Sequence, residues 1–499
     1  MKQSVSSLFV TERSDEMEVL MNFRERLVEK IHLYDGSKGF LLMRLGLAAG
    51  DCPDLWNLER EDQVEGIHRA YVDAGADVIQ TNTLQGSRFH LEARGLYEKL
   101  PQINGAGVRL AKKAAGKKAL VAASVGPTGK LMQPFGDFTF EAARAIFAEQ
   151  ITARLDAGAD ILHFETFTDL SELRAAVIAA KEVDPGAPVI ATLSFEAGGR
   201  TMMGDDARCA ALALESLGVD CLGANCGLAP EAMLKMFGRF TGGGVPLCSK
   251  PNAGAPVVEN GIARYGATVE EYYKTAFGFA RLGARLIGGC CGSGPEHIKR
   301  LREAVDEMNA CADDQFGLSA AERGGEHDPE RGGLGAEWDA GQTIASFGRA
   351  FTFGKAERKA LSGAVRQVFR GGGRDPKTGD GERGRKADGG GIDFVDLACL
   401  RARSADAREA AAIDLLSDAD ESDGKATVFC LVDQTRRGDG GREAAAMPGG
   451  AADAADILRT VAVNARSYHK KPLIFCVDES SALAAALSFY CGLAGVVLP

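Results

Sequence analysis

The chain has 499 residues, of which 45% are apolar and 25% are charged, and these proportions are typical of a globular protein with a large core. Its formal net charge is −11 and no basic stripe with interleaved aromatic residues occurs, which excludes nucleic acid as an expected partner. Residues 1–23 hold no apolar core of signal-peptide length, and no run reaches the roughly 18 apolar residues of a membrane span. We therefore expect a cytoplasmic protein that does not contact a membrane.

Short apolar runs, each followed by an amphipathic helical stretch, recur between about residues 20 and 310. The eight runs lie at 30–35, 76–82, 119–126, 159–166, 188–195, 219–226, 245–252 and 284–291. Near-continuous apolar runs are typical of strands that are buried on both faces of a parallel sheet. Eight such units over residues 20–310 predict an α/β protein with a (β/α)₈ TIM barrel. A doubly wound open sheet is the alternative, and the lack of a GxGxxG motif after any strand disfavours it.

The composition changes after residue 310. Residues 311–391 are rich in Gly and charged residues around a short helical segment, and the stretch 371–391 contains nine glycines and no large apolar residue. This composition is typical of a flexible linker. Strand-like runs then follow at 392–400, 426–433, 471–478 and 494–499, with helical stretches between them. We expect residues 392–499 to form a smaller, incomplete α/β domain after the barrel.

Polar and sulfur-bearing side chains follow several of the predicted strands, where barrel enzymes place their working residues. These residues are Asp35, Asn82, Glu165, Cys226, Cys290 and Cys291. The three cysteines follow the sixth and eighth strands, which lie close together on the rim of a barrel, so the thiols can converge. Three thiolates suit Zn²⁺ and leave a fourth position open, as in catalytic zinc sites. Ordinary packing of buried thiols and a vicinal disulfide between Cys290 and Cys291 are the alternatives.

A site of this kind favours alkyl transfer to sulfur. A substrate thiol that takes the open position becomes a thiolate at neutral pH, although its free pKa is about 8.5. A zinc ion that already carries three thiolates is a weak Lewis acid, so hydrolysis is disfavoured. Asp35 and Glu165 end the first and fourth predicted strands, where they can bind a substrate ammonium group or, alternatively, cap helices and form rim salt bridges. Together these features predict a pocket for a small amino acid that carries a thiol.

A series of short motifs along residues 20–305 resembles a known family. The motifs are DGSKG (35–39), GADVIQTNT (75–83), GPTGKL (126–131), FET (164–166), GANCG (223–227), KPNAG (250–254) and GGCCG (288–292). Their order resembles the homocysteine S-methyltransferase family, and CPDLWNLER (52–60) is most similar to its cobalamin-dependent methionine synthase branch. The resemblance implies a zinc-containing barrel that binds homocysteine.

The resemblance also assigns roles to individual residues. The zinc ion would be held by Cys226, Cys290 and Cys291, with no catalytic residue separate from the zinc site. Asp35 and Glu165 would contact the homocysteine amino group, and Asn225 would help to shape the site. Ser37 and Lys38 stand where the family often has a small residue and Met, so Lys38 would alter the mouth of the substrate pocket.

The C-terminal part resembles the family less closely. The segment 471–497 is similar to a strand–helix–strand piece of the folate (pterin-binding) domain that follows the barrel in methionine synthases, which suggests a shortened remnant of that domain. No D-x-H-x-x-G corrinoid-binding motif occurs, so a methylcorrinoid donor would be carried by a separate corrinoid protein.

The sequence therefore predicts a zinc-dependent, methionine synthase-like enzyme that transfers a methyl group to the thiol of homocysteine and forms methionine. The donor would be a methylcorrinoid, such as methylcobalamin supplied in trans, or a methylfolate. Three alternatives stay open: S-methylmethionine or betaine as the donor, another thiol as the acceptor, and a non-catalytic subunit that docks a corrinoid protein.

Overall fold

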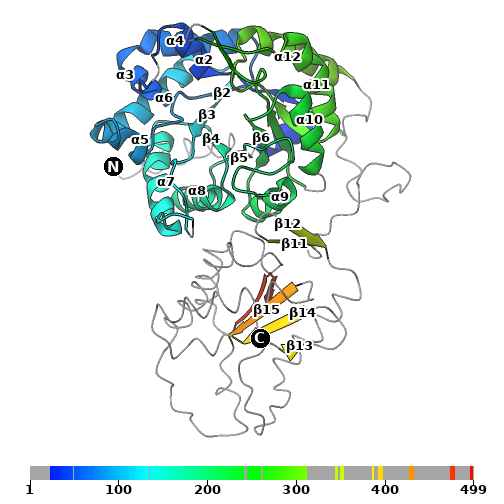
Figure 1. Ribbon diagram of the computed structural model, residues 1–499. Coiled ribbons are helices and arrows are strands. Elements are labelled where there is room, and N and C mark those ends of the chain that lie inside the picture. Colours follow the sequence, from blue (N-terminus) through cyan, green and yellow to red (C-terminus); the bar gives the residue numbers. More distant parts are fainter. Residues whose placement is uncertain are drawn as a thin grey trace, which may run out of the picture. The chain divides into compact units, whose positions relative to one another are not determined.

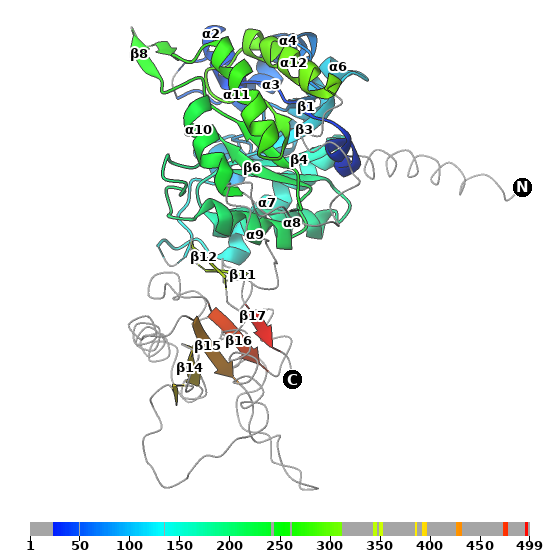
Figure 2. The ribbon, with the colours of Figure 1, turned by 90° about the vertical axis from the view of Figure 1, so that its right-hand side faces the viewer.

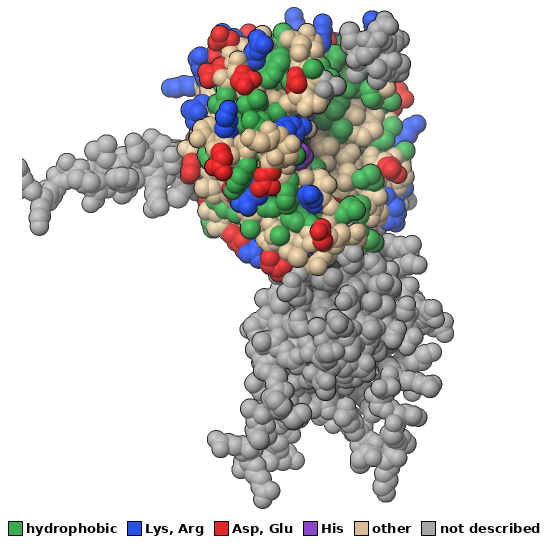
Figure 3. Space-filling view, turned by 60° about the vertical axis from the view of Figure 1, so that its left-hand side comes forward, with side chains coloured by type: hydrophobic (Ala, Val, Ile, Leu, Met, Phe, Trp, Pro, Cys, Tyr) green, Lys and Arg blue, Asp and Glu red, His purple; other side chains and the backbone are tan. Residues whose placement is uncertain are grey.

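The computed structural model describes residues 23–48, 50–133, 135–240, 244–259 and 262–311, together with short strands between residues 343 and 497. The chain forms two compact units, of which the first contains the barrel strands and the second the C-terminal strands. None of the described helices is long and apolar enough to cross a membrane. Positive and negative side chains are interspersed over the face of the barrel that Figure 3 shows.

The first unit is built around an eight-stranded parallel sheet. Its strands are β1 (His32–Leu33), β2 (Val78–Gln80), β3 (Leu120–Val125), β4 (Ile161–Phe167), β5 (Val189–Leu193), β6 (Cys221–Asn225), β7 (Leu247–Lys250) and β10 (Ala284–Ile287). They follow the order β1-β10-β7-β6-β5-β4-β3-β2. The sheet closes on itself because Tyr34 bridges Val78 in parallel and Asp35 N donates to Val78 O over 3.0 Å. The predicted TIM barrel is confirmed, and each of the eight apolar runs overlaps one barrel strand.

Helices surround the barrel strands (Figure 1). They are α2 (Lys38–Arg44), α3 (Trp56–Glu59), α4 (Glu61–Asp73), α5 (Arg88–Glu92), α6 (Leu100–Ala115), α7 (Phe140–Leu155), α8 (Leu170–Val183), α9 (Ala207–Ser216), α10 (Pro230–Phe237), α11 (Val269–Arg281) and α12 (Pro295–Ala310). Residues 23–29 are also helical, and single 3₁₀ turns lie at Pro53–Leu55, Tyr97–Lys99 and Gly238–Phe240. Helix starts follow local signals, because Thr268 and Glu271 form a capping box on α11 and Pro295 opens α12.

Burial explains why the strands read as continuous apolar runs. Most barrel strands contribute a buried side chain to one core cluster, which contains Phe23, Leu27, Tyr34, Val78, Ala122, Ile161, Ile190, Cys221, Cys248 and Leu286. Cys221 and Cys248 thus pack as small apolar core residues, as buried free cysteines often do. A short antiparallel pair, β8 (Val257–Glu259) and β9 (Ile262–Arg264), lies in the connection after β7.

The second unit contains a five-stranded sheet (Figure 2). Its parallel strands are β14 (Ile392–Asp396), β15 (Ala426–Leu431), β16 (Leu473–Val477) and β17 (Gly495–Val497), with β13 (Arg385–Lys386) antiparallel to β14. Each of the four strand-like runs predicted after residue 391 therefore contains a strand. An antiparallel pair of strands, β11 (Thr343–Ser346) and β12 (Arg349–Thr352), precedes them in the chain. The helices predicted for this part and most of the glycine-rich linker lie outside the described residues.

Candidate metal centre

Cys226 lies directly after β6 in an uncommon backbone conformation. Its φ is +61°, in the left-handed region that residues other than glycine seldom adopt, and Gly227 follows with φ +72°. The surrounding backbone holds this turn, because Cys226 N donates to Lys250 O over 3.0 Å and Leu228 N donates to Cys226 O over 2.8 Å. Such conformations cluster at functional sites. The turn lets the chain leave β6 sharply while the thiol stays at the barrel rim.

Cys290 and Cys291 lie after β10 in a loop that is anchored to the segment following β7. Cys290 N donates to Pro251 O over 2.8 Å, and Cys291 N donates to Asn252 Oδ1 over 3.1 Å. Gly292 has φ +80°, and a Cβ at this position would collide with the ring of Tyr265. Glycine is therefore required next to the cysteine pair, and the tight turn allows two neighbouring side chains to face one point.

The sulfur atoms of Cys226, Cys290 and Cys291 converge, lying within 4.8 Å of one another. In the described part of the chain, this is the only group of His, Cys, Asp or Glu side chains found to be arranged for a metal ion. All three are partly buried free thiols, and the Sγ atoms of Cys226 and Cys291 are 3.8 Å apart. A tetrahedral zinc ion with Zn–S bonds of about 2.3 Å also separates its sulfur ligands by about 3.8 Å. The donor set and spacing fit Zn²⁺, and no vicinal disulfide is formed.

The three thiols differ in the direction of their pKa shifts. Hydrogen bonds from Cys290 and Cys291 lower the pKa of Cys226 to about 3, because they stabilise its thiolate. The hydrogen bond to Cys226 raises the pKa of Cys290 to about 12 and also raises that of Cys291. Sulfur atoms this close cannot all be anionic without a cation between them, so the cluster is suited to binding a positive ion.

Asn225 connects the cysteine cluster to the neighbouring strands. Its Nδ2 lies 3.7 Å from Cys290 Sγ and donates to Thr166 Oγ1 over 2.7 Å. Its Oδ1 accepts from Thr166 N over 2.8 Å and from Thr192 Oγ1 over 2.6 Å. Both ends of the amide are therefore fixed, and the amide presents a donor to the sulfur. The structure places Asn225 at the cluster, where the sequence predicts it to shape the site.

Behind Asn225, a buried row of hydrogen bonds continues across the barrel. His163 Nε2 lies 3.0 Å from Thr192 Oγ1, and His163 Nδ1 lies 2.9 Å from Gln80 Nε2. Burial, together with the charges of Lys250 and Lys38, lowers the pKa of His163 well below its usual value, so the ring is neutral. The partners then define one tautomer, in which Nε2 donates to Thr192 and Nδ1 accepts. Each donor along this row points toward Cys290.

Asp35 follows β1 and is completely buried. Its Oδ2 accepts from Lys38 Nζ over 2.9 Å and from Gln80 N over 2.8 Å, and Lys250 Nζ lies 3.4 Å from its Oδ1. Lys250 is also buried, and its ammonium lies 3.8 Å from the centroid of the Tyr34 ring. Both Lys38 and Lys250 additionally donate to Gln80 Oε1. The structure thus places Asp35 among lysines, with both carboxylate oxygens engaged.

Glu165 lies near the end of β4 and is almost fully buried. Ser124 Oγ donates to its Oε1. Asn82, the other polar residue expected at a strand end, donates to Pro53 O over 2.8 Å and to Asn57 Oδ1 over 3.1 Å, so it fastens the loop after β2. Of the two carboxylates predicted at the rim, Glu165 therefore has fewer described hydrogen bonds than Asp35.

Sequence reasoning missed Lys250, His163 and Thr192. Lys250 lies within the KPNAG motif, and its position at the end of β7 was the available signal. His163 and Thr192 are polar residues inside otherwise apolar strands, a local inconsistency that commonly marks a functional or strained position.

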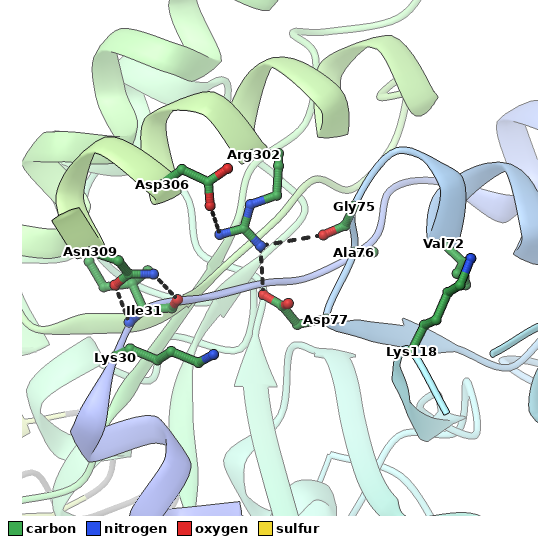
Figure 4. A pocket seen from close by; sticks show the side chains of 10 residues that line it. All are labelled: Lys30, Ile31, Val72, Gly75, Ala76, Asp77, Lys118, Arg302, Asp306 and Asn309. Atoms are coloured by element: carbon green, nitrogen blue, oxygen red, sulfur yellow. Dashed lines mark hydrogen bonds and ion pairs between the residues drawn. The ribbon is translucent and has the colours of Figure 1, made fainter. Parts of the chain in front are cut away.

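A pocket of about 510 Å³ lies away from the cysteines, near the residues that precede β1, β2 and β3 (Figure 4). It is lined by residues that include Lys30, Asp77, Lys118 and Arg302. Arg302 contacts Asp77 Oδ2 and Asp306 Oδ1, each at 2.9 Å. Barrel enzymes work at the opposite end, where the carboxyl ends of the strands and the three cysteines lie. The pocket is therefore not the candidate site.

Fold and site together define a (β/α)₈-barrel protein with a three-cysteine cluster at the carboxyl ends of its strands. The family model described as homocysteine S-methyltransferase matches residues 32–305, so the chain belongs to the homocysteine S-methyltransferase family.

Several known proteins are similar to the barrel part of this chain. Methionine synthase of Mycobacterium leprae is 32% identical over 303 residues, and that of Mycobacterium tuberculosis is 32% identical over 299 residues. These matches cover 57% and 56% of this chain, but only 25% of each relative. Among solved structures, the metallated form of the homocysteine methyltransferase MmuM from Escherichia coli is 28% identical, with a TM-score of 0.46 over 55% of this chain and 96% of that chain.

Proposed function

We propose that the protein is a zinc-dependent methyltransferase that transfers a methyl group to the thiol of homocysteine and so forms methionine. The observation that carries the proposal is the convergence of three cysteine sulfurs at the barrel rim of a member of this family. Cys226, Cys290 and Cys291 would hold the ion. A bound zinc ion supplies positive charge that keeps the acceptor sulfur in its reactive thiolate form at neutral pH. A reducing cytoplasm would keep the three cysteines unoxidised.

The residues around the sulfurs have separable tasks. Asn225 donates toward Cys290 Sγ, which orients that sulfur and offsets part of its negative charge. One carboxylate oxygen of Glu165 would bind the ammonium group of homocysteine, while the other, Oε1, accepts a hydrogen bond from Ser124 Oγ. Asp35 is the second predicted ammonium contact, for which Lys38 competes. Low solvent exposure of these groups strengthens their interactions with a bound ligand.

The methyl donor is proposed to be a methylcorrinoid held by a separate corrinoid protein, or a methylfolate. The methionine synthase relatives support the first choice only by their similarity to the barrel. We further propose that residues 20–310 form the homocysteine-binding barrel and that residues 392–499 form a partial α/β domain. Residues 311–391 would be the linker between these two parts. The parallel strands β14 to β17 support the assignment of the partial α/β domain.

A donor screen tests the proposal. Zinc-loaded protein is given homocysteine and, in separate reactions, methylcobalamin, methylfolate, S-methylmethionine or betaine, and methionine is quantified. We expect methionine from at least one donor with the wild-type chain, and none above background with Cys290→Ala. Turnover by the isolated chain with free methylcobalamin would reject the alternative of a non-catalytic docking subunit. Absence of methionine from every free donor and from methylcobalamin bound to a corrinoid protein, with zinc bound in about a 1:1 ratio, would contradict the proposed function.

A further inference from the structure

Lys38 occupies a position that its own helix does not explain. It is the first residue of α2, whose N-cap is Ser37 and whose first turn contains no acidic residue. The positive end of the helix dipole disfavours a lysine there. The side chain turns back instead, and its Nζ reaches the carboxylate of Asp35, three residues earlier in the chain. A contact outside the helix therefore accounts for this cation.

The Lys38 ammonium is bound as a ligand ammonium would be. Its Nζ lies 2.9 Å from Asp35 Oδ2, 3.2 Å from Gln80 Oε1 and 3.3 Å from Gly36 O. These three acceptors match the three N–H donors of an ammonium group. The side chain is mostly buried, with 11% of its surface exposed, so water competes little for the same contacts. The protein therefore supplies both this ammonium group and the three oxygen atoms that accept its hydrogen bonds.

The charges near the rim also balance without a ligand. Asp35 contacts the ammonium groups of both Lys38 and Lys250, and the charge of Glu165 also acts on Lys38. Buried charges require partners, and a pair of unneutralised carboxylates would strongly favour a cationic ligand. Here Asp35 contacts both lysines, so the ammonium of an amino acid would meet one incompletely paired carboxylate, Glu165, rather than two.

We propose that Lys38 is a specificity-determining residue that takes the place of a ligand ammonium at Asp35, so that the rim site beside the cysteines accepts short thiols whether or not they carry an ammonium group. The acceptor class then includes ω-mercapto carboxylates such as 4-mercaptobutanoate, the deamino analogue of homocysteine. The transfer is the same for both acceptors. A sulfur–carbon bond forms on the acceptor, the donor–methyl bond breaks with its electron pair left on the donor, and the thiol proton leaves to water.

This inference rests on the proposed function, because it assumes that the rim beside the cysteines binds the acceptor. Its test is separate, since it measures product binding by calorimetry and needs neither a methyl donor nor a metal ion. The two ligands are L-methionine and 4-(methylthio)butanoate, which differ only in the ammonium group. Failure of the donor screen above would overturn the function, whereas the binding ratio decides the role of Lys38.

In the wild type we expect the two dissociation constants to agree within about threefold. In Lys38→Met, which keeps an unbranched side chain but removes the charge, Asp35 Oδ2 keeps the hydrogen bond from Gln80 N and regains one free acceptor position. One charge-assisted hydrogen bond then favours L-methionine by about tenfold or more. Lys118→Met makes the same substitution at the opposite end of the barrel and should keep the wild-type ratio. In Lys38→Ala, added ethylammonium should restore the wild-type ratio by filling the vacated position.

A wild-type preference for L-methionine of about tenfold or more would overturn the inference, even if the Lys38 variants fail to fold. An unchanged ratio in folded Lys38→Met would overturn it as well, as would the failure of both ligands to bind the wild type.

Discussion

The two ends of the barrel use polar side chains in different ways. At the carboxyl ends of the strands, buried groups are held in uncommon states: Cys226 and Thr166 have φ values of +61° and +63°, and Asp35 is fully buried among lysines. At the opposite end, Arg302 pairs with Asp77 and Asp306 at a partly exposed surface beside the pocket. The pocket therefore lies at the end with ordinary surface ion pairs, and the reactive groups lie at the other.

Concave volume alone therefore does not locate the working end of this barrel. Loops at the carboxyl ends of strands can vary in chemistry without disturbing the sheet, whereas the opposite end serves stability. Strained backbone and buried polar groups are costly, and they persist where the surrounding structure determines them fully. If this comparison is right, substitutions at the rim change metal and ligand binding, and substitutions at the opposite end change stability alone.

The largest expected effect is the loss of metal binding in Cys226→Ala. Removal of one of three sulfur ligands should weaken zinc affinity by more than about 100-fold, since even partners that only support a ligand are worth 10–100-fold. Zinc affinity is measured by competition with a chromophoric chelator. Cys311→Ala is the matched control, because Cys311 is an exposed cysteine at the end of α12 and should leave zinc affinity unchanged. Equal zinc affinities in both variants would show that Cys226 does not bind the ion.

A smaller effect is expected from Thr192→Val, which removes a hydroxyl while keeping the shape of the side chain. Asn225 Oδ1 then loses a donor at 2.6 Å and His163 Nε2 loses its acceptor at 3.0 Å. The amide that faces Cys290 is less firmly oriented, so metal affinity should fall by about tenfold. The absorption of the Co²⁺-substituted protein should shift as well, because it reports the sulfur environment. Thr275→Val, whose hydroxyl bonds only within α11, should change neither quantity.

The convergence of the cysteines could be predicted because it depends on local signals and one global rule. The strand ends at Cys226 and Cys290 are marked by adjacent glycines, and a closed parallel barrel brings all carboxyl ends to one rim. The same reasoning cannot separate these cysteines from Cys221 and Cys248 by residue type alone. Only their position within the strand, rather than after it, places those two in the core.

The polar network could not be predicted, because it depends on which strand interiors face one another. Gln80, His163 and Thr192 come from β2, β4 and β5, and their contacts follow from the register and tilt of the barrel. The pairing of Lys250 with Asp35 likewise joins β7 to β1, residues separated by 215 positions. Local patterns identify each strand but carry no information on such cross-barrel distances.

The third effect concerns the dependence of stability on pH. Glu172, at the start of α8 near the rim, is 3% exposed, and burial raises its pKa to about 7 from 4.5. Because the folded state holds this proton more tightly than the unfolded state, the contribution is fully present below about pH 4.5. It is lost as the pH rises through about 7. Glu172→Gln cannot titrate, so the unfolding free energy of the variant should rise by about 3 kcal/mol relative to that of the wild type between pH 4.5 and 8.

Denaturant unfolding of both proteins across this pH range measures the difference directly, and subtraction cancels the other titrating groups. The Gln side chain keeps an oxygen for the Thr128 N–H, which lies 2.7 Å from Glu172 Oε1. If the unfolding free energies of the two proteins differ by the same amount at every pH, the pKa of the Glu172 carboxyl is not raised in the folded state. The contrast between the two ends of the barrel would then be weaker.

The smallest effect is expected at the opposite end, from Arg302→Ala. Its two ion pairs, to Asp77 and Asp306, are partly exposed and screened by water, so their loss should cost about 1 kcal/mol of unfolding free energy. The aliphatic part of the side chain also packs against Gly75, which adds to the loss. Zinc affinity should stay at the wild-type value, because the site lies at the other ends of the strands. A change in zinc affinity comparable to that of Thr192→Val would show that the ends are coupled through the barrel, and the separation of stability from function would fail.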